Sequence, residues 1–291
     1  MAFHKWILKH AERLGGKTVA ISGATGGLGK ELCHYLASLG AKLILLDRNM
    51  EKSHALREKL LLTHPRAQIS HIQVDMSSLE SVRLATDELK QQPLHMLILN
   101  AGAYSIPRYQ TEEGYDNVFT INCISPYYMV RELLPHLSDC GGRVVAVGSI
   151  AHRYSKIHEQ DVDFSTFTKA SLVYGNAKRH LMFSLHELMS TSNVPLAITH
   201  PGITFTGITN HYAKWLFALI KYPMKVIFMH PRKAALSLLI GCFEDTEYGT
   251  WFGPRLFDIW GKPAKRRLRG VKTEEKQTIF ARMEKIYEKV K

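Results

Sequence analysis

Short runs of apolar residues that favour β-strands recur along the chain and alternate with longer segments of helical periodicity. Each run is nearly all apolar, which is typical of strands buried on both faces of a sheet. The predicted strands are residues 18–22, 42–47, 71–75, 96–100, 143–148 and 195–200, and the predicted helices are residues 30–40, 51–62, 78–91, 113–138, 168–191 and 273–291. This alternation predicts an α/β fold, a doubly wound parallel sheet with helices on both faces.

Chain length and cysteine content narrow the class of protein further. A chain of 291 residues is long enough for one large α/β domain or for two smaller ones. We find no linker-like stretch of low complexity and no internal repeat, so a single domain is the simplest interpretation. The four cysteines form no C-x-x-C pair and show no metal-ligand spacing, which favours a reducing, cytoplasmic compartment and no metal site.

The net charge is +12, and much of it lies in the basic run of residues 262–272. Such a patch attracts phosphates, anionic lipid or nucleic acid. Nucleic-acid modules carry further marks, such as zinc-ligand spacing or aromatic RNA-binding motifs, and the sequence has none of them. We therefore expect no nucleic-acid partner. We interpret the run as a solvated segment, and weak contact with an anionic membrane surface is the alternative.

A glycine-rich loop, SGATGGLG at residues 22–29, lies between the first predicted strand and the first helix. A phosphate loop of the NTPase type would need a glycine where Ala24 stands and a hydroxyl where Glu31 stands, so that motif fails twice. The spacing Gly23-x-x-x-Gly27-x-Gly29 also departs from strict G-x-G-x-x-G. It still allows a sharp exit from the strand and close approach of backbone N–H groups to a pyrophosphate, which favours a dinucleotide.

The residues after the second strand bear on which dinucleotide binds. Asp47 ends that strand, where a carboxylate can accept hydrogen bonds from an adenosine ribose. Arg48 follows it and could instead bind the 2′-phosphate of NADP. Placing a carboxylate against a dianionic phosphate costs more than one flexible arginine returns, so we expect NAD(H), with NADP(H) as the alternative.

A tyrosine and a lysine, Tyr174 and Lys178, lie four residues apart and so share one face of a predicted helix. An ammonium near a phenol favours the phenolate. Lowering the pKa of a tyrosine by ~3 units from ~10 requires roughly 4 kcal/mol. The pair alone could be an ordinary surface pair. Ser149, at the end of an apolar strand, makes chemistry the better interpretation, because its hydroxyl could bind a carbonyl that Tyr174 protonates.

Together these motifs resemble the classical short-chain dehydrogenase/reductase family, and residues 15–180 are most similar to its retinol-dehydrogenase-like branch. The matching segments are SGATGGLG, Asp75-Met76, LNAG at 99–102, NVFTINCISP around Asn122, VGSIA around Ser149, YGNAK at 174–178 and HPGITFT at 200–206. The resemblance implies a Rossmann-type sheet of about seven strands, and hydride transfer between a nicotinamide cofactor and an alcohol or ketone. Ser22, Leu99 and Gly148 depart from the usual family residues but are tolerated variants.

The resemblance also implies residue roles. Tyr174 is the general acid/base, Lys178 binds the nicotinamide ribose and lowers the pKa of Tyr174, Ser149 orients the substrate oxygen, and Asn122 holds a proton-relay water. The expected cofactor-binding residues are Gly23, Thr25, Gly27, Leu28, Gly29, Asp47, Arg48, Asp75, Met76, Asn100, Ala101, Gly102, Tyr174, Lys178, Pro201, Gly202, Ile203 and Thr206.

The expected substrate site lies in the segments least like the family. Residues 203–230 are unusually apolar and would form a helical lid, which favours a steroid-, retinoid- or long-chain-like alcohol or ketone over a sugar. We expect the substrate to contact Ser149, Tyr154, Tyr174 and Trp215.

We divide the chain into an N-terminal amphipathic leader (1–15), the main domain with its lid (16–260), and a basic segment with a C-terminal helix (261–291). The leader is too short and too charged for a secretory signal, and Phe3 and Trp6 could rest on a membrane surface. No run reaches the ~18–20 apolar residues of a spanning helix. The last helix has an apolar side for docking or oligomer contacts, and we expect a homodimer or homotetramer.

Two other functions remain open at this stage. The chain could be a non-catalytic dinucleotide-binding protein with a regulatory role, or a scaffold at a membrane surface. The set of Asn122, Ser149, Tyr174 and Lys178 argues against the first, because binding alone needs no acid beside a lysine. The second is compatible with an enzyme.

Overall fold

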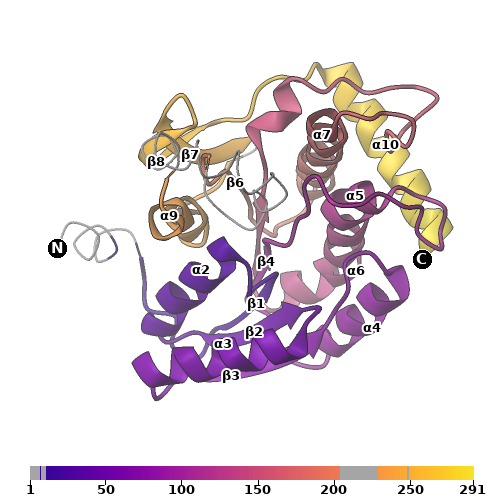
Figure 1. Cartoon of the computed structure of the whole chain (residues 1–291). Coiled ribbons are helices and arrows are strands. Elements are labelled where there is room, and N and C mark those ends of the chain that lie inside the picture. The colour runs from indigo at the N-terminus through magenta and orange to yellow at the C-terminus, as the bar shows by residue number, and fades with distance from the viewer. Residues whose placement is uncertain (1–6, 8–10, 204–228, 248) are drawn as a thin grey trace, which may run out of the picture.

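The computed structural model describes residues 7, 11–203, 229–247 and 249–291. Its sheet has eight strands in the order β3-β2-β1-β4-β5-β6-β7-β8 (Figure 1), and all neighbours pair in parallel except β7 and β8. The strands are β1 Thr18–Ser22, β2 Lys42–Asp47, β3 Gln68–Gln73, β4 Met96–Leu99, β5 Arg143–Val147, β6 Leu196–Thr199, β7 Thr250–Leu256 and β8 Trp260–Arg267. The predicted doubly wound α/β sheet is confirmed, with one strand more than the seven expected.

The helices cover both faces of this sheet. They are α2 Gly27–Ser38, α3 Met50–Thr63, α4 Leu79–Leu89, α5 Asn117–Phe119, α6 Ser125–Asp139, α7 Ala170–Met189, α9 Pro231–Gly241 and α10 Thr273–Val290. One core cluster joins the sheet to α4, α6, α7 and α10, and a second joins it to α2, α3 and α9. The sheet is thus the middle layer of a three-layer fold (Figure 1).

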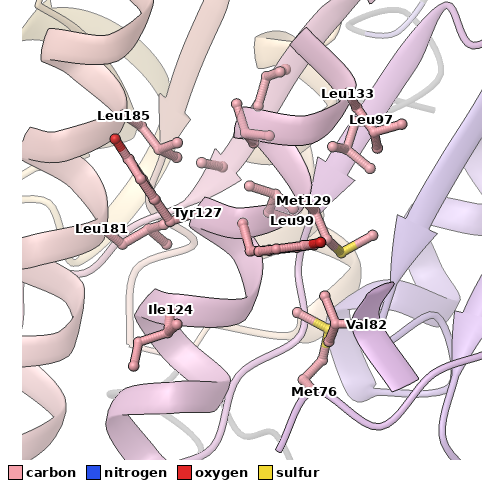
Figure 2. Packing of buried hydrophobic residues seen from close by; sticks show 14 of the residues in the cluster. Met76, Val82, Leu97, Leu99, Ile124, Tyr127, Met129, Leu133, Leu181 and Leu185 are labelled. Carbon is pink, nitrogen blue, oxygen red and sulfur yellow. The ribbon is translucent and has the colours of Figure 1, made fainter. Parts of the chain in front are cut away.

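Burial on both faces explains why the central strands are continuously apolar. In β4, Leu97 and Leu99 belong to the first core cluster, whereas Met96 and Ile98 belong to the second. Figure 2 shows Leu97 and Leu99 near Leu133 and the other side chains of that first cluster. Successive side chains of a strand point to opposite faces, so a strand covered on both sides needs apolar residues throughout.

Two predicted elements differ from those observed. The third strand spans Gln68–Gln73 instead of 71–75, and its burial alternates because it lies at the sheet edge. The helix predicted over 113–138 consists of the short α5, a π-helical turn at Thr120–Ile124, and α6. Single π turns of this kind often occur at functional sites, and this one carries Asn122.

The basic run is not a free solvated segment. Its first residues form β8, which pairs antiparallel with β7. The boundary that we drew at residue 260 therefore falls at the start of a strand of the main sheet. A single-sequence view missed β8 because its cationic residues give no apolar alternation, while edge strands tolerate such residues.

The C-terminal helix α10 docks on its own chain. Its predicted apolar side, Ile279, Met283, Ile286 and Val290, is buried in the core cluster shared with α6 and α7. Tyr127 of α6 donates a hydrogen bond to Glu284 at 2.6 Å, which fixes the helix further. This apolar side is consequently covered within one chain and is not available to a second copy.

Among the residues that the structure describes, no helix combines the length and the apolar character that crossing a bilayer requires.

Candidate active site

The glycine loop leaves β1 at Gly23, which has a φ of +65° that favours glycine. A Cβ on Gly23 would lie 2.9 Å from the Cα of Ala101, and a Cβ on Gly29 would lie 2.4 Å from the carbonyl oxygen of Gly23. Backbone therefore packs on backbone at both positions. Gly26 precedes α2 and provides no side-chain cap, so the first N–H groups of α2 remain available to an anion.

Asp47 braces this glycine loop through hydrogen bonds of its carboxylate. The side chain is only 3% exposed, and its Oδ1 accepts hydrogen bonds from the backbone N–H (3.0 Å) and the hydroxyl (2.9 Å) of Thr25. Its Oδ2 accepts one from the hydroxyl of Ser53 at 2.9 Å, and that hydroxyl also contacts His71 at 2.9 Å. The sequence alone did not predict this role, because Ser53 and His71 come close to Asp47 only when helix α3 and strand β3 pack beside β2.

A cavity of about 440 Å³ opens over the loop and the ends of the strands. The Arg48 side chain is 72% exposed at this cavity, and its guanidinium lies 3.7 Å from the carboxylate of Asp75. The predicted cofactor residues in its lining are Gly23, Thr25, Gly27, Leu28, Asp47, Arg48, Asp75, Met76, Asn100, Ala101 and Gly102. These residues suit a dinucleotide, because the cavity combines an uncapped helix N-terminus, a glycine cradle and the carboxylates of Asp47 and Asp75.

Ser22 ties the end of β4 to the glycine loop. Its hydroxyl oxygen accepts hydrogen bonds from the N–H groups of Asn100 (3.1 Å) and Ala101 (3.0 Å). The Asn100 amide donates in return to the carbonyls of Ser22 (3.0 Å) and Gly23 (2.9 Å). The serine at this departure from the family pattern thus holds the two loops of the cavity together.

Asn122 and Lys178 converge on Gly102. The Asn122 amide donates to the carbonyls of Ala103 and Val118, both at 2.8 Å, and its Oδ1 accepts from the N–H of Ala103 at 3.2 Å. A Cβ on Gly102 would lie 2.9 Å from Asn122 Oδ1 and 3.8 Å from Lys178 Nζ. Gly102 lines the cavity, so the two buried polar groups lie directly behind the cavity wall at a position where a side chain would crowd Asn122.

The pKa values of the tyrosine and lysine are set mainly by burial. Burial raises the pKa of Tyr174 to about 12 and lowers that of Lys178 to about 8. Lys178 Nζ donates to the carbonyl of Val147 at 2.9 Å and lies 5.8 Å from the centre of the Tyr174 ring. The pKa of Tyr174 is thus raised in this structure, contrary to the expected lowering, because burial of the phenol outweighs the hydrogen bond with Ser149.

Three other side chains surround the hydroxyl of Tyr174. A hydrogen bond with Ser149 lowers the pKa of Tyr174, although less than burial raises it. The ring of Tyr104 meets that of Tyr174 edge-on, with centroids 5.4 Å apart, and Tyr104 also lines the cofactor cavity. Tyr154, the third of these side chains, is 56% exposed to solvent. Sequence reasoning missed Tyr104, although it follows the LNAG segment by two residues.

The last predicted segment is described only at its ends. Gly202 has a φ of +79°, and a Cβ there would lie 2.6 Å from the carbonyl oxygen of Ile259. The N–H of Met229 donates to the carbonyl of Ile203 at 2.9 Å, so the predicted lid starts and finishes at one place beside buried Pro201. Thr206, Trp215 and the other residues of 204–228 lie outside the described residues.

Comparison with known proteins was consistent with this geometry. A family model described as short chain dehydrogenase matches residues 17–216. Retinol dehydrogenase 14 of Mus musculus is 30% identical over 262 residues, which cover 82% of this chain and 78% of that protein. Retinol dehydrogenase 11 of Homo sapiens is 28% identical over 221 residues, which cover 73% of this chain and 70% of that protein.

Solved structures share the fold. An uncharacterised protein from Mycobacterium paratuberculosis aligns with a TM-score of 0.77 at 24% identity, over 95% of both chains. A short chain dehydrogenase/reductase from Burkholderia phymatum in complex with NAD aligns with a TM-score of 0.57 at 19% identity, over 77% of this chain and 84% of that chain. RhlG of Pseudomonas aeruginosa with NADP aligns with a TM-score of 0.62 at 20% identity, over 80% and 91%.

Proposed function

Because this chain belongs to the short-chain dehydrogenase family, we propose that it transfers a hydride between a nicotinamide cofactor and a hydrophobic alcohol or ketone. Family membership makes it a dehydrogenase/reductase acting on CH–OH donors. The observation that carries the proposal is that Asn122, Lys178 and the cavity over the glycine loop meet at Gly102, beside Tyr174. A non-catalytic role would leave this convergence unexplained.

The nicotinamide cofactor would supply or accept the hydride when bound. In carbonyl reduction, the hydroxyl of Tyr174 gives its proton to the substrate oxygen and becomes a phenolate. Ser149 donates a hydrogen bond that orients that oxygen. A pKa of about 12 keeps Tyr174 protonated at neutral pH, and the nearby Lys178 ammonium stabilises the phenolate that forms.

Reduction is expected to lose efficiency as the pH rises past about 8. Burial lowers the pKa of Lys178 to about 8, so its positive charge is present below this pH and lost above it. Tyr174 stays protonated throughout this range, and thus cannot cause the loss. The measurement is kcat/KM for ketone reduction between pH 6 and 10. Lys178→Arg keeps the positive charge at all these pH values and should remove the decrease in kcat/KM above a pH of about 8. A wild-type profile that stays flat would contradict the assignment of this decrease to Lys178.

NAD(H) is the favoured cofactor. An ionised carboxylate has about four lone-pair positions, and three of those on Asp47 accept bonds from Thr25 and Ser53, which leaves one for a ribose hydroxyl. A 2′-phosphate would meet Asp47 as well as exposed Arg48. NADP(H) is the alternative, supported by that exposure of Arg48.

Wild-type enzyme is expected to show the higher kcat/KM with NADH, and Asp47→Ser to invert this preference. A change in discrimination of about 2 to 4 kcal/mol, or roughly 30- to 1000-fold, is the scale for losing a charge-assisted bond and a repulsion. Since Asp47→Ser also removes the brace on Thr25, Arg48→Ala serves as the matched variant. It should weaken NADPH use alone. If the wild-type enzyme already prefers NADPH, then Arg48, and not Asp47, determines the cofactor preference.

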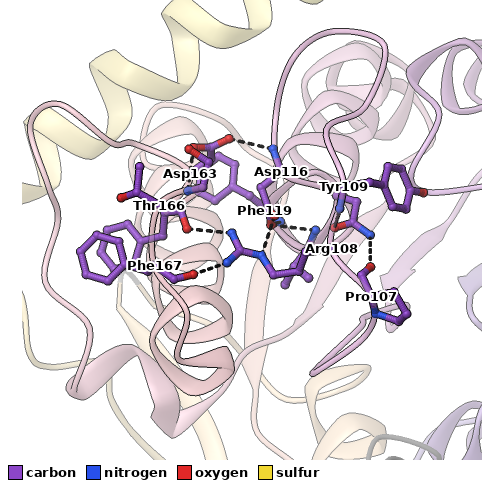
Figure 3. Close-up of polar contacts among 12 residues, drawn as sticks. Pro107, Arg108, Tyr109, Asp116, Phe119, Asp163, Thr166 and Phe167 are labelled. Carbon is purple, nitrogen blue, oxygen red and sulfur yellow. Dashed lines mark hydrogen bonds and ion pairs between the residues drawn. The ribbon is translucent and has the colours of Figure 1, made fainter.

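The walls flanking Tyr174 support an apolar substrate. Val173 packs with Val118 and Phe164, and partly buried Phe167 and Ile106 pack against this cluster; Ile106 also lines the cavity. The loops that carry them are held in place by Arg108 (Figure 3). Its guanidinium donates to Asp116 (2.8 Å) and to the carbonyls of Phe164 (2.7 Å) and Phe167.

A screen of cofactor oxidation against hydrophobic ketones, with NADH and NADPH in parallel, tests this substrate class. Retinoid-, steroid- and long-chain carbonyls should turn over in preference to sugars. The retinol dehydrogenases to which the chain is similar carry an apolar substrate in their names. Turnover of sugars alone would overturn the apolar class and leave the reaction type intact.

Assembly and location stay proposals. We propose a cytoplasmic homodimer or homotetramer that does not use the apolar side of α10, because α6 and α7 already cover it. We further propose that the cytoplasmic protein makes weak contact with an anionic membrane surface. Phe3 and Trp6 of the leader lie outside the described residues, whereas residues 262–272 of the basic run lie within them.

A further inference from the structure

The turn between β7 and β8 exposes large apolar side chains to solvent. Phe257 is 82% exposed, Leu256 54% and Trp260 39%. Single exposed apolar residues are ordinary on protein surfaces, but three within five residues at one hairpin tip form a patch. We call residues 255–262 the hairpin tip; Figure 1 shows β7 and β8 together at one end of the sheet.

The backbone holds Phe257 outward at an energetic cost. Phe257 has a φ of +53° and Asp258 one of +59°, and this region is unfavourable for a bulky aromatic residue. Asp258 offsets that cost because its buried carboxylate accepts hydrogen bonds from Arg153 (2.7 Å), Trp251 (3.0 Å) and Arg266 (3.0 Å). An exposed aromatic residue fixed in a strained turn indicates a surface selected for contact.

Positive charge surrounds the apolar tip. Asp258 is the only acidic residue of residues 249–272, and it is buried and paired with Arg153 and Arg266. No acidic side chain of this segment therefore faces solvent. The exposed cations of the same segment are Arg255, Lys262, Lys265, Arg267, Arg269 and Lys272, of which Lys265 lies 3.8 Å from the exposed carboxylate of Glu247.

This pattern fits one kind of partner best. Aromatic and aliphatic side chains amid lysine and arginine favour the interface of an anionic bilayer, where rings enter the headgroup region and cations meet lipid phosphates and carboxylates. A second copy of the chain fits less well, because pairing two β8 edges would bring like charges together.

The tip lies at the rim of the candidate active site. The carbonyl of Ile259 packs against Gly202, at the predicted nicotinamide end. Arg153, which binds Asp258, belongs to the 3-10 turn that begins just after Ser149. A surface that rests on the tip would therefore lie next to exposed Tyr154 and the substrate side of Tyr174.

We propose that the hairpin tip docks the enzyme on an anionic lipid surface, so that exposed Tyr154 lies next to the bilayer. Apolar substrate could then pass from the lipid to Tyr174 without crossing water. This last step rests on the proposed substrate class, whereas docking itself does not.

Docking is tested by sedimentation of the full chain with sucrose-loaded vesicles, without cofactor or substrate. Vesicles of phosphatidylcholine containing about 30% phosphatidylserine should bind wild type at low salt, and binding should weaken at high salt. The double variant Leu256→Ser/Phe257→Ser should bind at least about tenfold less. The matched control Leu62→Ser/Leu84→Ser removes two exposed leucines from helices α3 and α4, and should bind like wild type.

A second pair of variants tests the charge. Lys262→Glu should weaken binding to the anionic vesicles, and Lys59→Glu on α3 should not. Thermal melting confirms that each variant folds. Equal binding of the tip variants and wild type would overturn the proposal and assign any binding to another segment, such as the leader; equal wild-type binding to neutral vesicles, or no binding, would also overturn it. Activity on a water-soluble ketone, measured separately, reports on the proposed function alone.

Discussion

Tyr174→Phe is expected to lower turnover by at least about 1000-fold while leaving dinucleotide affinity nearly unchanged. The substitution removes a single oxygen, the proposed proton donor to the substrate, which hydrogen-bonds with Ser149. General acid catalysis by a positioned group contributes roughly 10²- to 10⁴-fold, and the reaction offers no second acid at this position. The phenyl ring still fills the place against Tyr104, so the fold and the cavity should persist. The measurements are kcat by cofactor oxidation and cofactor affinity by fluorescence titration.

The neighbouring tyrosines supply the controls for this experiment. Tyr154→Phe removes a hydroxyl from a side chain that is 56% exposed, and Tyr104→Phe removes one from the ring that meets Tyr174 edge-on. Both should keep turnover within about tenfold of wild type, because neither hydroxyl transfers the proton. Residual activity above a few per cent in Tyr174→Phe would remove Tyr174 from its role. Loss of turnover in Tyr104→Phe alone would transfer the acid role to Tyr104.

Gly29→Ala is expected to weaken dinucleotide binding by roughly 100-fold, or about 2.7 kcal/mol. The added methyl would lie 2.4 Å from the carbonyl oxygen of Gly23 and 2.7 Å from that of Ala24. Both contacts are backbone atoms, so the loop must move away from α2 and from the brace at Asp47. Overpacking of this kind costs about 1–3 kcal/mol of stability as well. The measurements are cofactor affinity by titration and the free energy of unfolding in urea.

Gly15→Ala is the matched control, because a Cβ on Gly15 meets no atom within 4 Å. It should leave both cofactor affinity and unfolding free energy close to those of wild type. If Gly29→Ala bound cofactor as tightly as wild type, the close packing of loop and helix would not be what shapes the binding site. The assignment of the glycine loop to the dinucleotide would then need another support.

Local patterns in the sequence predicted most of the scaffold. Strands such as β4 are apolar at every position because both faces are covered, and that signal is present in four consecutive residues. The spacing of Tyr174 and Lys178 places them on one side of α7, and the crowding of glycines between β1 and α2 marks the candidate dinucleotide loop. Each of these features depends on residues close together in the chain, so periodicity and spacing suffice.

Contacts between distant segments decided the rest. Ser53 and His71 meet Asp47 only because α3 and β3 pack beside β2, and no local pattern announces that brace. Strand β8 forms from a cationic run because β7 offers its backbone an edge to pair with, while cationic side chains of the strand stay exposed.

The sequence by itself thus determined the fold class and the family, and it supplied the candidate loop and the candidate catalytic set, because spacing and periodicity carry these signals. Only the tertiary structure decided the electrostatics of that set. Burial raises the pKa of Tyr174 to about 12 and lowers that of Lys178 to about 8. Burial depends on how segments far apart in the chain pack around these side chains, so the spacing of two neighbours on one helix could not predict it.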